Sequence, residues 1–100
     1  MAIALGEPTI PLTTLGIAIF APAASGVYAI CDANNAYVYF GESNDIQRRL
    51  TEHLNDATHC IHRHGAASFT FDLVDGAFAR ILRQNELIAA YRTPCNQMMG

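Results

Sequence analysis

Two short tyrosine-containing segments place the strongest restriction on how this sequence can fold. Residues 26–28 (Gly-Val-Tyr) and 39–41 (Tyr-Phe-Gly) each lie in an apolar, aromatic run. Residues 32–35 between them, Asp-Ala-Asn-Asn, are of the types that form turns. Two aromatic runs joined by a short turn predict a β-hairpin, with strands over about 26–31 and 36–40. We expect Gly41 to end the second strand, because a side chain would crowd a turn there.

A helix is predicted directly after the hairpin, over about Asp45–Ala57. Asn44 is a suitable N-cap, and Gln47 three residues later gives the spacing of a capping box. Apolar residues at helical spacing give this helix one buried face, and they are Ile46, Leu50, Leu54 and Ala57. Arg49 and His53 are four residues apart, so they lie on one side of the helix, at the edge of that buried face.

The second half of the sequence predicts one more strand and one more helix. Residues 58–67 are polar and rich in histidine, and we expect them to form a connecting loop. Alternation then predicts a strand over about Ser68–Val74, whose buried face consists of Phe69, Phe71 and Leu73. After Asp75-Gly76, a helix is predicted over about Ala77–Arg92, and Pro94 prevents its continuation. Its apolar positions are Phe78, Ile81, Leu82, Ile88 and Tyr91.

Residues 1–24 form an apolar lead-in before this predicted core. We expect the lead-in to pack on or near the sheet, with one short extended piece near Ile17–Phe20. It would cover the sheet edge or pair with a second subunit. Residues 25–100 then form the domain itself. The order hairpin, helix, strand, helix predicts an α+β fold, with a small three-stranded antiparallel sheet flanked by helices.

The composition limits the class of protein. No apolar run approaches the roughly 20 residues that span a bilayer, so we expect no membrane segment. No basic residue precedes Arg48, whereas a secretory signal begins with a basic region. The three cysteines, Cys31, Cys60 and Cys95, are odd in number and widely spaced. We therefore expect no disulfide framework, and a cytoplasmic location.

Residues 26–96 together resemble a GIY-YIG nuclease domain. The two tyrosine tripeptides resemble the two tripeptides of the family. Residues 41–53 (Gly-Glu-Ser-Asn-Asp-Ile-Gln-Arg-Arg-Leu-Thr-Glu-His) resemble the segment that carries its arginine and a following histidine or tyrosine. Leu87-Ile88, Tyr91, Pro94 and Asn96 resemble its closing pattern. The resemblance implies a divalent-metal-dependent endonuclease that hydrolyses DNA phosphodiester bonds.

The resemblance also implies a role for each of five residues. Tyr39 or Tyr28 would position and deprotonate the attacking water, which requires a nearby cation that lowers the pKa of the phenol. Arg49 would supply that cation and would bind the scissile phosphate. His53 would relay a proton or polarise a tyrosine. Asn96 would hold the end of the chain against the site.

One position departs from the family pattern. The family places a metal-binding glutamate on the second helix, three residues before a Leu-Ile pair, and this chain has Gln84 there. An amide is a poorer ligand than a carboxylate for the Mg²⁺ or Mn²⁺ that the family implies. Glu86 could replace it only in a shifted helix register, because residues two apart on a helix differ by about 200°. A natural loss of the metal ligand, an introduced Glu→Gln change and a shifted register are the three explanations.

The net charge of −3 is unfavourable for binding DNA, yet Arg48, Arg49, Arg63 and all four histidines fall between residues 48 and 64. A local basic patch can therefore form on this acidic chain, and Arg48 and Arg63 are expected DNA contacts. Within this segment, His59, Cys60, His62 and His64 match no standard zinc-finger spacing. We favour a flexible loop that touches DNA over a metal site, and we expect Cys60 and Cys95 to be small buried residues.

Two functions remain open from the sequence. The first is a metal-dependent endonuclease that acts on DNA, impaired by Gln84. The second is a catalytically silent module on the same scaffold, which binds nucleic acid or protein. A protein partner or a homodimer is compatible with either function.

Overall fold

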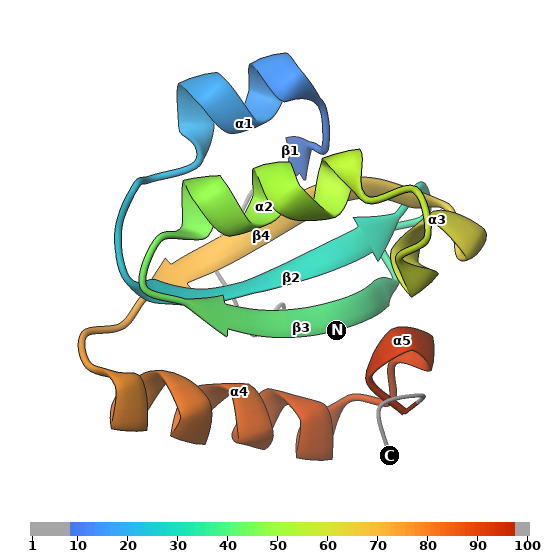
Figure 1. Cartoon of the computed structure of the whole chain (residues 1–100). Helices are drawn as coiled ribbons and strands as arrows, with labels where there is room; N and C mark the ends of the chain where they lie inside the picture. The colour runs from blue at the N-terminus through green and yellow to red at the C-terminus, as the bar shows by residue number, and fades with distance from the viewer. Residues whose placement is uncertain (1–8, 98–100) are drawn as a thin grey trace.

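Four antiparallel strands form a sheet at the centre of the molecule, in the order β1-β4-β2-β3 (Figure 1). The computed structural model describes residues 9–97. The strands are β1 (Ile10–Pro11), β2 (Gly26–Asp32), β3 (Tyr37–Ser43) and β4 (Ala66–Leu73). The predicted hairpin is β2–β3, and the α+β fold is confirmed. The sheet has one strand more than expected, because β1 pairs with β4 through Ile10 opposite Phe69.

Helices lie on both sides of this sheet (Figure 1). The five helices of the described residues are α1 (Thr14–Phe20), α2 (Ile46–Asn55), α3 (Cys60–Arg63), α4 (Ala77–Ala90) and α5 (Pro94–Gln97). Helix α2 lies over one face with α1 beyond it, and α4 lies over the opposite face. The longest described helix, α4, has 14 residues, and none of the helices in residues 9–97 is long and apolar enough to cross a membrane.

Alternation along the strands divides the core into two clusters. The cluster on the α2 face contains Tyr28, Ile30 and Tyr39 from the strands, together with Ile46 and Leu50 from α2. The cluster on the α4 face contains Val27, Ala29, Phe40 and Leu87. Neighbouring strand residues point to opposite faces, and the two tyrosines of the hairpin, Tyr28 and Tyr39, both face α2 rather than α4.

Gly41 does not end the second strand, because β3 continues to Ser43. Gly41 lies opposite Tyr28 in the register of β2 and β3. A Cβ atom added at Gly41 would overlap the phenol ring and hydroxyl of Tyr28. The glycine is therefore required by the close approach of the tyrosine ring to the backbone, and not by a turn.

The N-terminal cap of α2 is Asp45, one residue later than predicted. The Asp45 carboxylate accepts a hydrogen bond from the amide of Arg48 at 3.0 Å. The side chain of Asn44 instead accepts a hydrogen bond from the guanidinium of Arg48 at 3.1 Å. The capping box assigned to Asn44 and Gln47 is therefore wrong. The amide of Gln47 donates to the carbonyl of Ala21 at 3.2 Å, which ties α2 to the end of α1.

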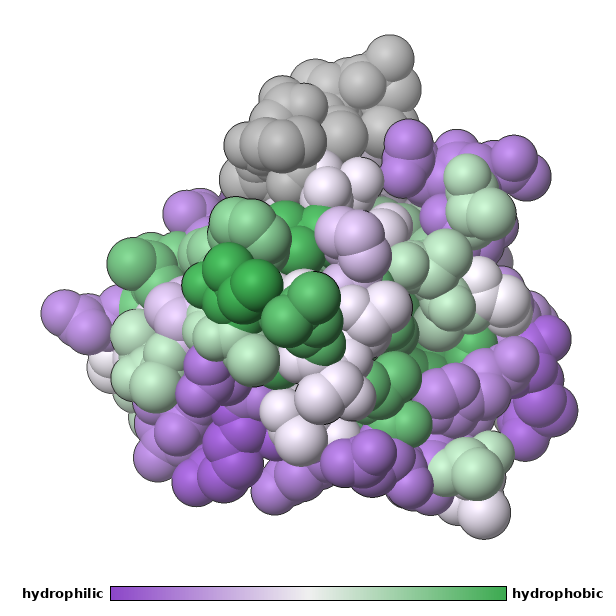
Figure 2. Space-filling view, turned by 90° about the horizontal axis from the view of Figure 1, so that it is seen from above, coloured by the Kyte–Doolittle hydropathy of each residue, from purple (hydrophilic) through white to green (hydrophobic). Residues whose placement is uncertain are grey.

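The predicted lead-in contains a helix where an extended piece near Ile17–Phe20 was expected. Thr13 caps α1 by accepting a hydrogen bond from the amide of Gly16, and Ile17 points into the core. Three large apolar side chains of α1 remain exposed, namely Leu15, Ile19 and Phe20. Figure 2, which looks down on α1, shows apolar side chains gathered on this face. Residues 1–8 of the lead-in lie outside the described residues.

Three further expectations for the second half of the chain are wrong. The loop expected at 58–67 contains the one-turn helix α3. In β4, Leu73 is 58% exposed, whereas Thr70, opposite Ala29 of β2, is buried. At the start of α4, Phe78, Ile81 and Leu82 are exposed instead of forming part of the core. Leu87, farther along α4, is the residue of this helix that is buried against the sheet.

Candidate active site

A tyrosine and a histidine from different elements meet in the interior of the protein. The hydroxyl oxygen of Tyr28 on β2 lies 2.6 Å from Nε2 of His53 on α2. Both residues are almost fully buried, with exposed fractions of 1% for Tyr28 and 2% for His53. The last turn of α2 therefore places an imidazole directly over the hairpin.

Tyr39 on β3 joins this pair. Its ring centroid lies 6.3 Å from that of Tyr28 and 5.5 Å from that of His53. The register explains why the two phenols are neighbours: Tyr28 lies opposite Gly41 and Tyr39 lies opposite Ile30, so both project from the same face. Tyr39 is 8% exposed and is therefore the phenol that is more accessible to solvent.

His53 is held in its neutral form. The pKa of His53 is lowered to about 3, mainly by burial. The positive charges of the nearby His59 and Arg49 lower it further. A neutral imidazole carries a proton on only one nitrogen, so Nε2 can accept the hydroxyl proton of Tyr28. His53 is thus a buried base with a hydrogen-bonded acid as its partner.

The two tyrosines are also held in their neutral forms. Burial raises the pKa of Tyr28 far above its usual range, and it raises the pKa of Tyr39 as well. The guanidinium of Arg49 acts against this rise at both residues, but burial outweighs it. The expectation that Arg49 lowers the pKa of a phenol below its ordinary value is therefore wrong for this arrangement. Among these groups, neutral His53 is the better proton acceptor.

Arg49 lies at the exposed edge of the site. Its Nη1 lies 2.9 Å from a carboxylate oxygen of Glu52, and its side chain is 45% exposed. Glu52 also lies 3.8 Å from the guanidinium of Arg48. Arg63, the other expected DNA contact, is exposed on α3. The arginines on α2 therefore share a carboxylate at the surface, one turn before the buried His53.

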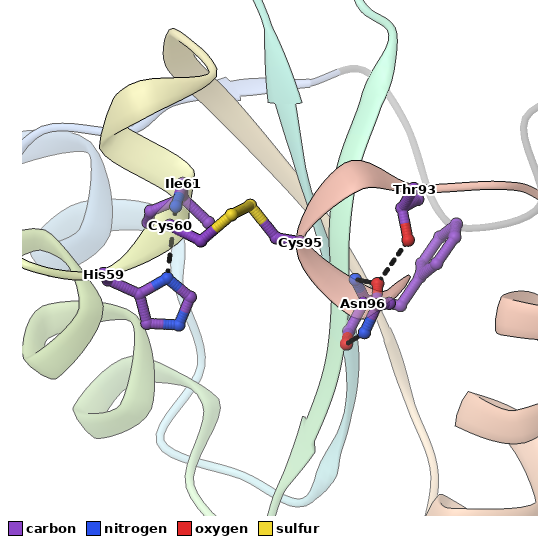
Figure 3. The surroundings of a disulfide bond; sticks show 7 residues. His59, Cys60, Ile61, Thr93, Cys95 and Asn96 are labelled. Carbon is purple, nitrogen blue, oxygen red and sulfur yellow. Dashed lines mark hydrogen bonds between the residues drawn. A yellow bond between two sulfur atoms is a disulfide. The ribbon is translucent and has the colours of Figure 1, made fainter. Parts of the chain in front are cut away.

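Asn96 on α5 binds the backbone of β3 next to Tyr39. Its Oδ1 accepts a hydrogen bond from the amide of Phe40 at 2.7 Å, and its Nδ2 donates to the carbonyl of Phe40 at 3.0 Å. Oδ1 also accepts a hydrogen bond from the hydroxyl of Thr93 (Figure 3). These bonds use both ends of the side-chain amide, so Asn96 fixes α5 to the strand that carries Tyr39.

Gln84 is half-buried on α4, in the layer opposite to that of the tyrosines (Figure 1). One turn earlier on α4, Nε of Arg80 lies 2.7 Å from a carboxylate oxygen of Glu42 on β3. The negative charge of Glu42 contributes to the raised pKa values of Tyr28 and Tyr39. Glu86 is exposed, and its carboxylate lies 3.5 Å from Arg83.

These residues fit a hard divalent cation poorly. Such a cation takes several oxygen ligands, usually including one or two carboxylates. The position expected for a carboxylate holds the amide of Gln84, and the carboxylate of Glu42 is already paired with Arg80. Within residues 9–97, no group of three or more Asp, Glu, His or Cys ligands lies beside the tyrosines.

No pattern in the sequence indicated that His59 belongs to this cluster. His59 caps α3, where its Nδ1 accepts a hydrogen bond from the amide of Ile61 at 3.2 Å. Its ring centroid lies 4.5 Å from that of His53 and 5.2 Å from that of Tyr39. Burial lowers the pKa of His59, as it does for His53. Only the fold of the 58–67 segment brings this second imidazole to the tyrosines.

Cys60, next to His59, forms a disulfide with Cys95, next to Asn96 (Figure 3). The Cα atoms of the two cysteines are 5.6 Å apart, although 35 residues separate them in the sequence. The expectation that the cysteines form no disulfide is therefore wrong, whereas Cys31 is free and buried. The bond links α3 to α5, and it lies between His59 and Asn96 in the fold.

A family model describes the part of the chain that carries the tyrosine hairpin and α2. Residues 24–81 match the model of the GIY-YIG catalytic domain. The chain belongs to the GIY-YIG family. The match includes Tyr28, Tyr39, Arg49 and His53, and it ends before Gln84 and Asn96. No curated protein sequence gives a significant match.

Solved structures of GIY-YIG domains are also similar to this chain. The N-terminal endonuclease domain of UvrC from Thermotoga maritima, bound to magnesium as its catalytic divalent cation, superposes with a TM-score of 0.66. It is 24% identical, and the alignment covers 76% of this chain and 86% of that domain. A tyrosine-to-phenylalanine point mutant of the same domain, also bound to its catalytic cation, gives a TM-score of 0.65 at 24% identity. At this identity the likeness establishes a shared fold.

Proposed function

We propose that this GIY-YIG domain is an endonuclease that hydrolyses phosphodiester bonds in DNA, at a rate limited by Gln84. The observation that carries the proposal is the 2.6 Å hydrogen bond between Tyr28 and His53, with Tyr39 beside them. Aromatic residues that only filled a core would not require a neutral imidazole bonded to a buried hydroxyl. This arrangement supports the removal of a proton from a nucleophile at the surface of the cluster.

The chemistry divides among the residues according to their exposure. Tyr39 is the more exposed phenol, and its hydroxyl positions the attacking water. The buried Tyr28–His53 pair takes up the proton, because neutral His53 accepts it through the hydroxyl of Tyr28. Arg49, at the rim, binds the nonbridging oxygens of the phosphate after its guanidinium turns from Glu52. Asn96 positions β3, and through it Tyr39, without touching the substrate.

The weak point of the site is its binding of a divalent cation. In a GIY-YIG nuclease the cation neutralises charge on the phosphate and on the leaving oxygen. The amide of Gln84 and the paired carboxylate of Glu42 support weak binding of Mg²⁺ or Mn²⁺, and therefore slow cleavage. Glu86 is exposed beside Arg83, which gives no support to its use as a substitute ligand.

The experiment is a cleavage assay on branched, nicked and linear DNA with Mg²⁺ or Mn²⁺. We expect slow cutting by the natural chain and faster cutting by Gln84→Glu, by at least about 100-fold, because the carboxylate restores a ligand. Asn85→Glu is the matched control, since Asn85 is exposed on the same helix. Equal rates for Gln84→Glu and Asn85→Glu would overturn the assignment of Gln84.

A catalytically silent module that binds DNA is the second candidate, and Gln84 is the observation that favours it. Binding of DNA that weakens with added salt, without cutting by either the natural chain or Gln84→Glu, would support this alternative. Arg48 and Arg63 are exposed and are the proposed contacts to the phosphate backbone. Arg48→Gln and Arg63→Gln should each weaken binding to every DNA sequence by a similar factor.

We further propose that the domain works in the cytoplasm, where a DNA substrate lies. A homodimer or a protein partner would add the specificity that a single domain of this size lacks, and residues 1–24 are the proposed contact. Size-exclusion chromatography with and without DNA tests whether the domain forms a homodimer. Thiol-disulfide exchange in a reducing cytoplasm would open the bond between Cys60 and Cys95.

A further inference from the structure

Three side chains of the kind that bind soft metals lie together outside the tyrosine cluster. The ligand atoms of Cys60, His64 and Cys95 are all within 4.8 Å of one another. Cys60 begins α3 and Cys95 lies on α5 (Figure 3). His64 caps the C-terminal end of α3. Among residues 9–97 this is the one cluster with the composition of a metal site.

We propose that the reduced form of this protein binds one Zn²⁺ through Cys60, His64 and Cys95, with water as the fourth ligand. Zinc prefers thiolate sulfur and imidazole nitrogen at about 2.0 to 2.3 Å in a tetrahedral arrangement. Ligand atoms in such a site are roughly 3.3 to 3.8 Å apart. After reduction the two sulfur atoms, no longer bonded to each other, can separate to this distance, while the imidazole of His64, within 4.8 Å of them, needs only a small movement. His64 is exposed and can make that movement by rotating its side chain.

The disulfide must open before the metal binds. A dithiol reductant breaks the sulfur–sulfur bond by exchange, transfers two electrons and two protons to Cys60 and Cys95, and becomes a disulfide itself. Zinc then replaces the two thiol protons, which leave to solvent, and binds two thiolates and a neutral imidazole. The two negative thiolate charges balance the charge of the ion, so burial of Cys95 does not oppose binding.

The neighbouring histidines are committed to other contacts, which limits the ligand set to these three residues. Nε2 of His62 lies 3.0 Å from the carbonyl oxygen of His53. Nδ1 of His59 accepts a hydrogen bond from the amide of Ile61. In the proposed site, zinc takes over the link between α3 and α5 that the disulfide provides in the oxidised protein. It thereby keeps His59 and Asn96 near Tyr39 when the bond is reduced.

Zinc binding by the full chain tests the proposal directly. The protein is reduced with a phosphine, which becomes a phosphine oxide, and is then stripped of metal and titrated with Zn²⁺. We expect one zinc per chain, and with Co²⁺ the absorption of a tetrahedral thiolate site. His64→Ala should weaken binding by at least about tenfold, whereas His62→Ala should bind as the natural chain does.

Two results would overturn the proposal. One is the absence of stoichiometric zinc in the reduced protein. The other is equal zinc affinity for His64→Ala and His62→Ala, which would mean that His64 is not a ligand. Cys95→Ser should abolish binding, and circular dichroism of the variant shows whether it is folded. If Cys95→Ser is unfolded, comparison of His64→Ala with His62→Ala tests the zinc site instead, because both variants replace exposed residues and retain the cysteine pair.

Discussion

Tyr28 and His53, 25 residues apart in the chain, are joined at 2.6 Å in the protein interior. Burial keeps both groups neutral, since it raises the pKa of the phenol and lowers that of the imidazole to about 3. A neutral acid hydrogen-bonded to a neutral base is stable without solvent, yet it can accept a proton from outside through the phenol. This relationship accounts for the proposed chemistry of the site.

Tyr28→Phe should lower the rate of DNA cleavage by at least about 100-fold, measured in the more active Gln84→Glu background. The variant removes the hydroxyl that bonds to His53 but retains the ring in the core. It should cost about 1 kcal/mol of unfolding free energy, the usual value for one hydrogen bond. Tyr37→Phe is the control, because Tyr37 packs against Phe40 and Tyr91 on the α4 face. A similar loss of activity in both variants would contradict the assigned role.

Gly41→Ala should destabilise the fold by about 1 to 3 kcal/mol, because the added Cβ overlaps the ring of Tyr28. Urea denaturation measures the loss. A double-mutant cycle with Tyr28→Leu tests the cause, since removing the ring should relieve the overlap and make the two effects non-additive. Additive effects would show that the glycine is required for a reason other than the phenol.

Stability should fall as the pH is lowered from about 6.5 toward 3, in part because of His53. The pKa of His53 is about 3 in the folded protein and about 6.5 in an unfolded chain, so the unfolded chain binds more protons in this range. His53 contributes a slope of at most about 1.4 kcal/mol per pH unit. Burial lowers the pKa of His59 as well, and this adds a change of the same sign.

Urea denaturation between about pH 7 and pH 4 measures that dependence. His53→Gln should flatten the slope, whereas Asn85→Ala, a change at an exposed position without a titratable group, should leave it as in the natural chain. An unchanged slope in His53→Gln would mean that His53 is protonated in the folded protein.

Asn96→Ala should cost about 2 kcal/mol of stability, because it leaves the amide and the carbonyl of Phe40 without partners. Asn96→Asp should also destabilise the protein, because it keeps the acceptor for the Phe40 amide but places a carboxylate oxygen against the Phe40 carbonyl oxygen. Asn85→Ala, at an exposed position on α4, should change stability by no more than about 0.5 kcal/mol. Denaturant unfolding separates these cases, and equal effects of Asn96→Ala and Asn85→Ala would contradict the structural role of Asn96.

The predictions made from the sequence were most accurate where the pattern is local. The hairpin, helix α2 and strand β4 each have a periodic apolar pattern within about ten residues, and each was found close to its predicted position. The cap of α2 was misplaced by one residue because Asn44 and Asp45 are both good caps. Local pattern alone does not decide between neighbouring residues that share the same propensity.

Contacts between distant segments were not predictable in this way. The pairing of Cys60 with Cys95 joins segments 35 residues apart, and an odd number of cysteines gave no indication of it. Phe78, Ile81 and Leu82 have the pattern of a buried helical face, yet they are exposed. Thr70 is polar, yet it is buried in β4, opposite Ala29 of β2. Each outcome depends on how the helices pack against the sheet, and no short stretch of sequence determines that packing.

The sequence by itself determined the residue types of the site and the elements that carry them: tyrosines on two paired strands, with an arginine and a histidine one turn apart on the next helix. Only the tertiary structure decided the protonation states of these groups, the inclusion of His59 and the link between α3 and α5. The physical reason is that strand and helix periodicity depends on neighbours in the chain. Burial, and with it the pKa of every buried group, depends on the residues that the whole fold packs around it.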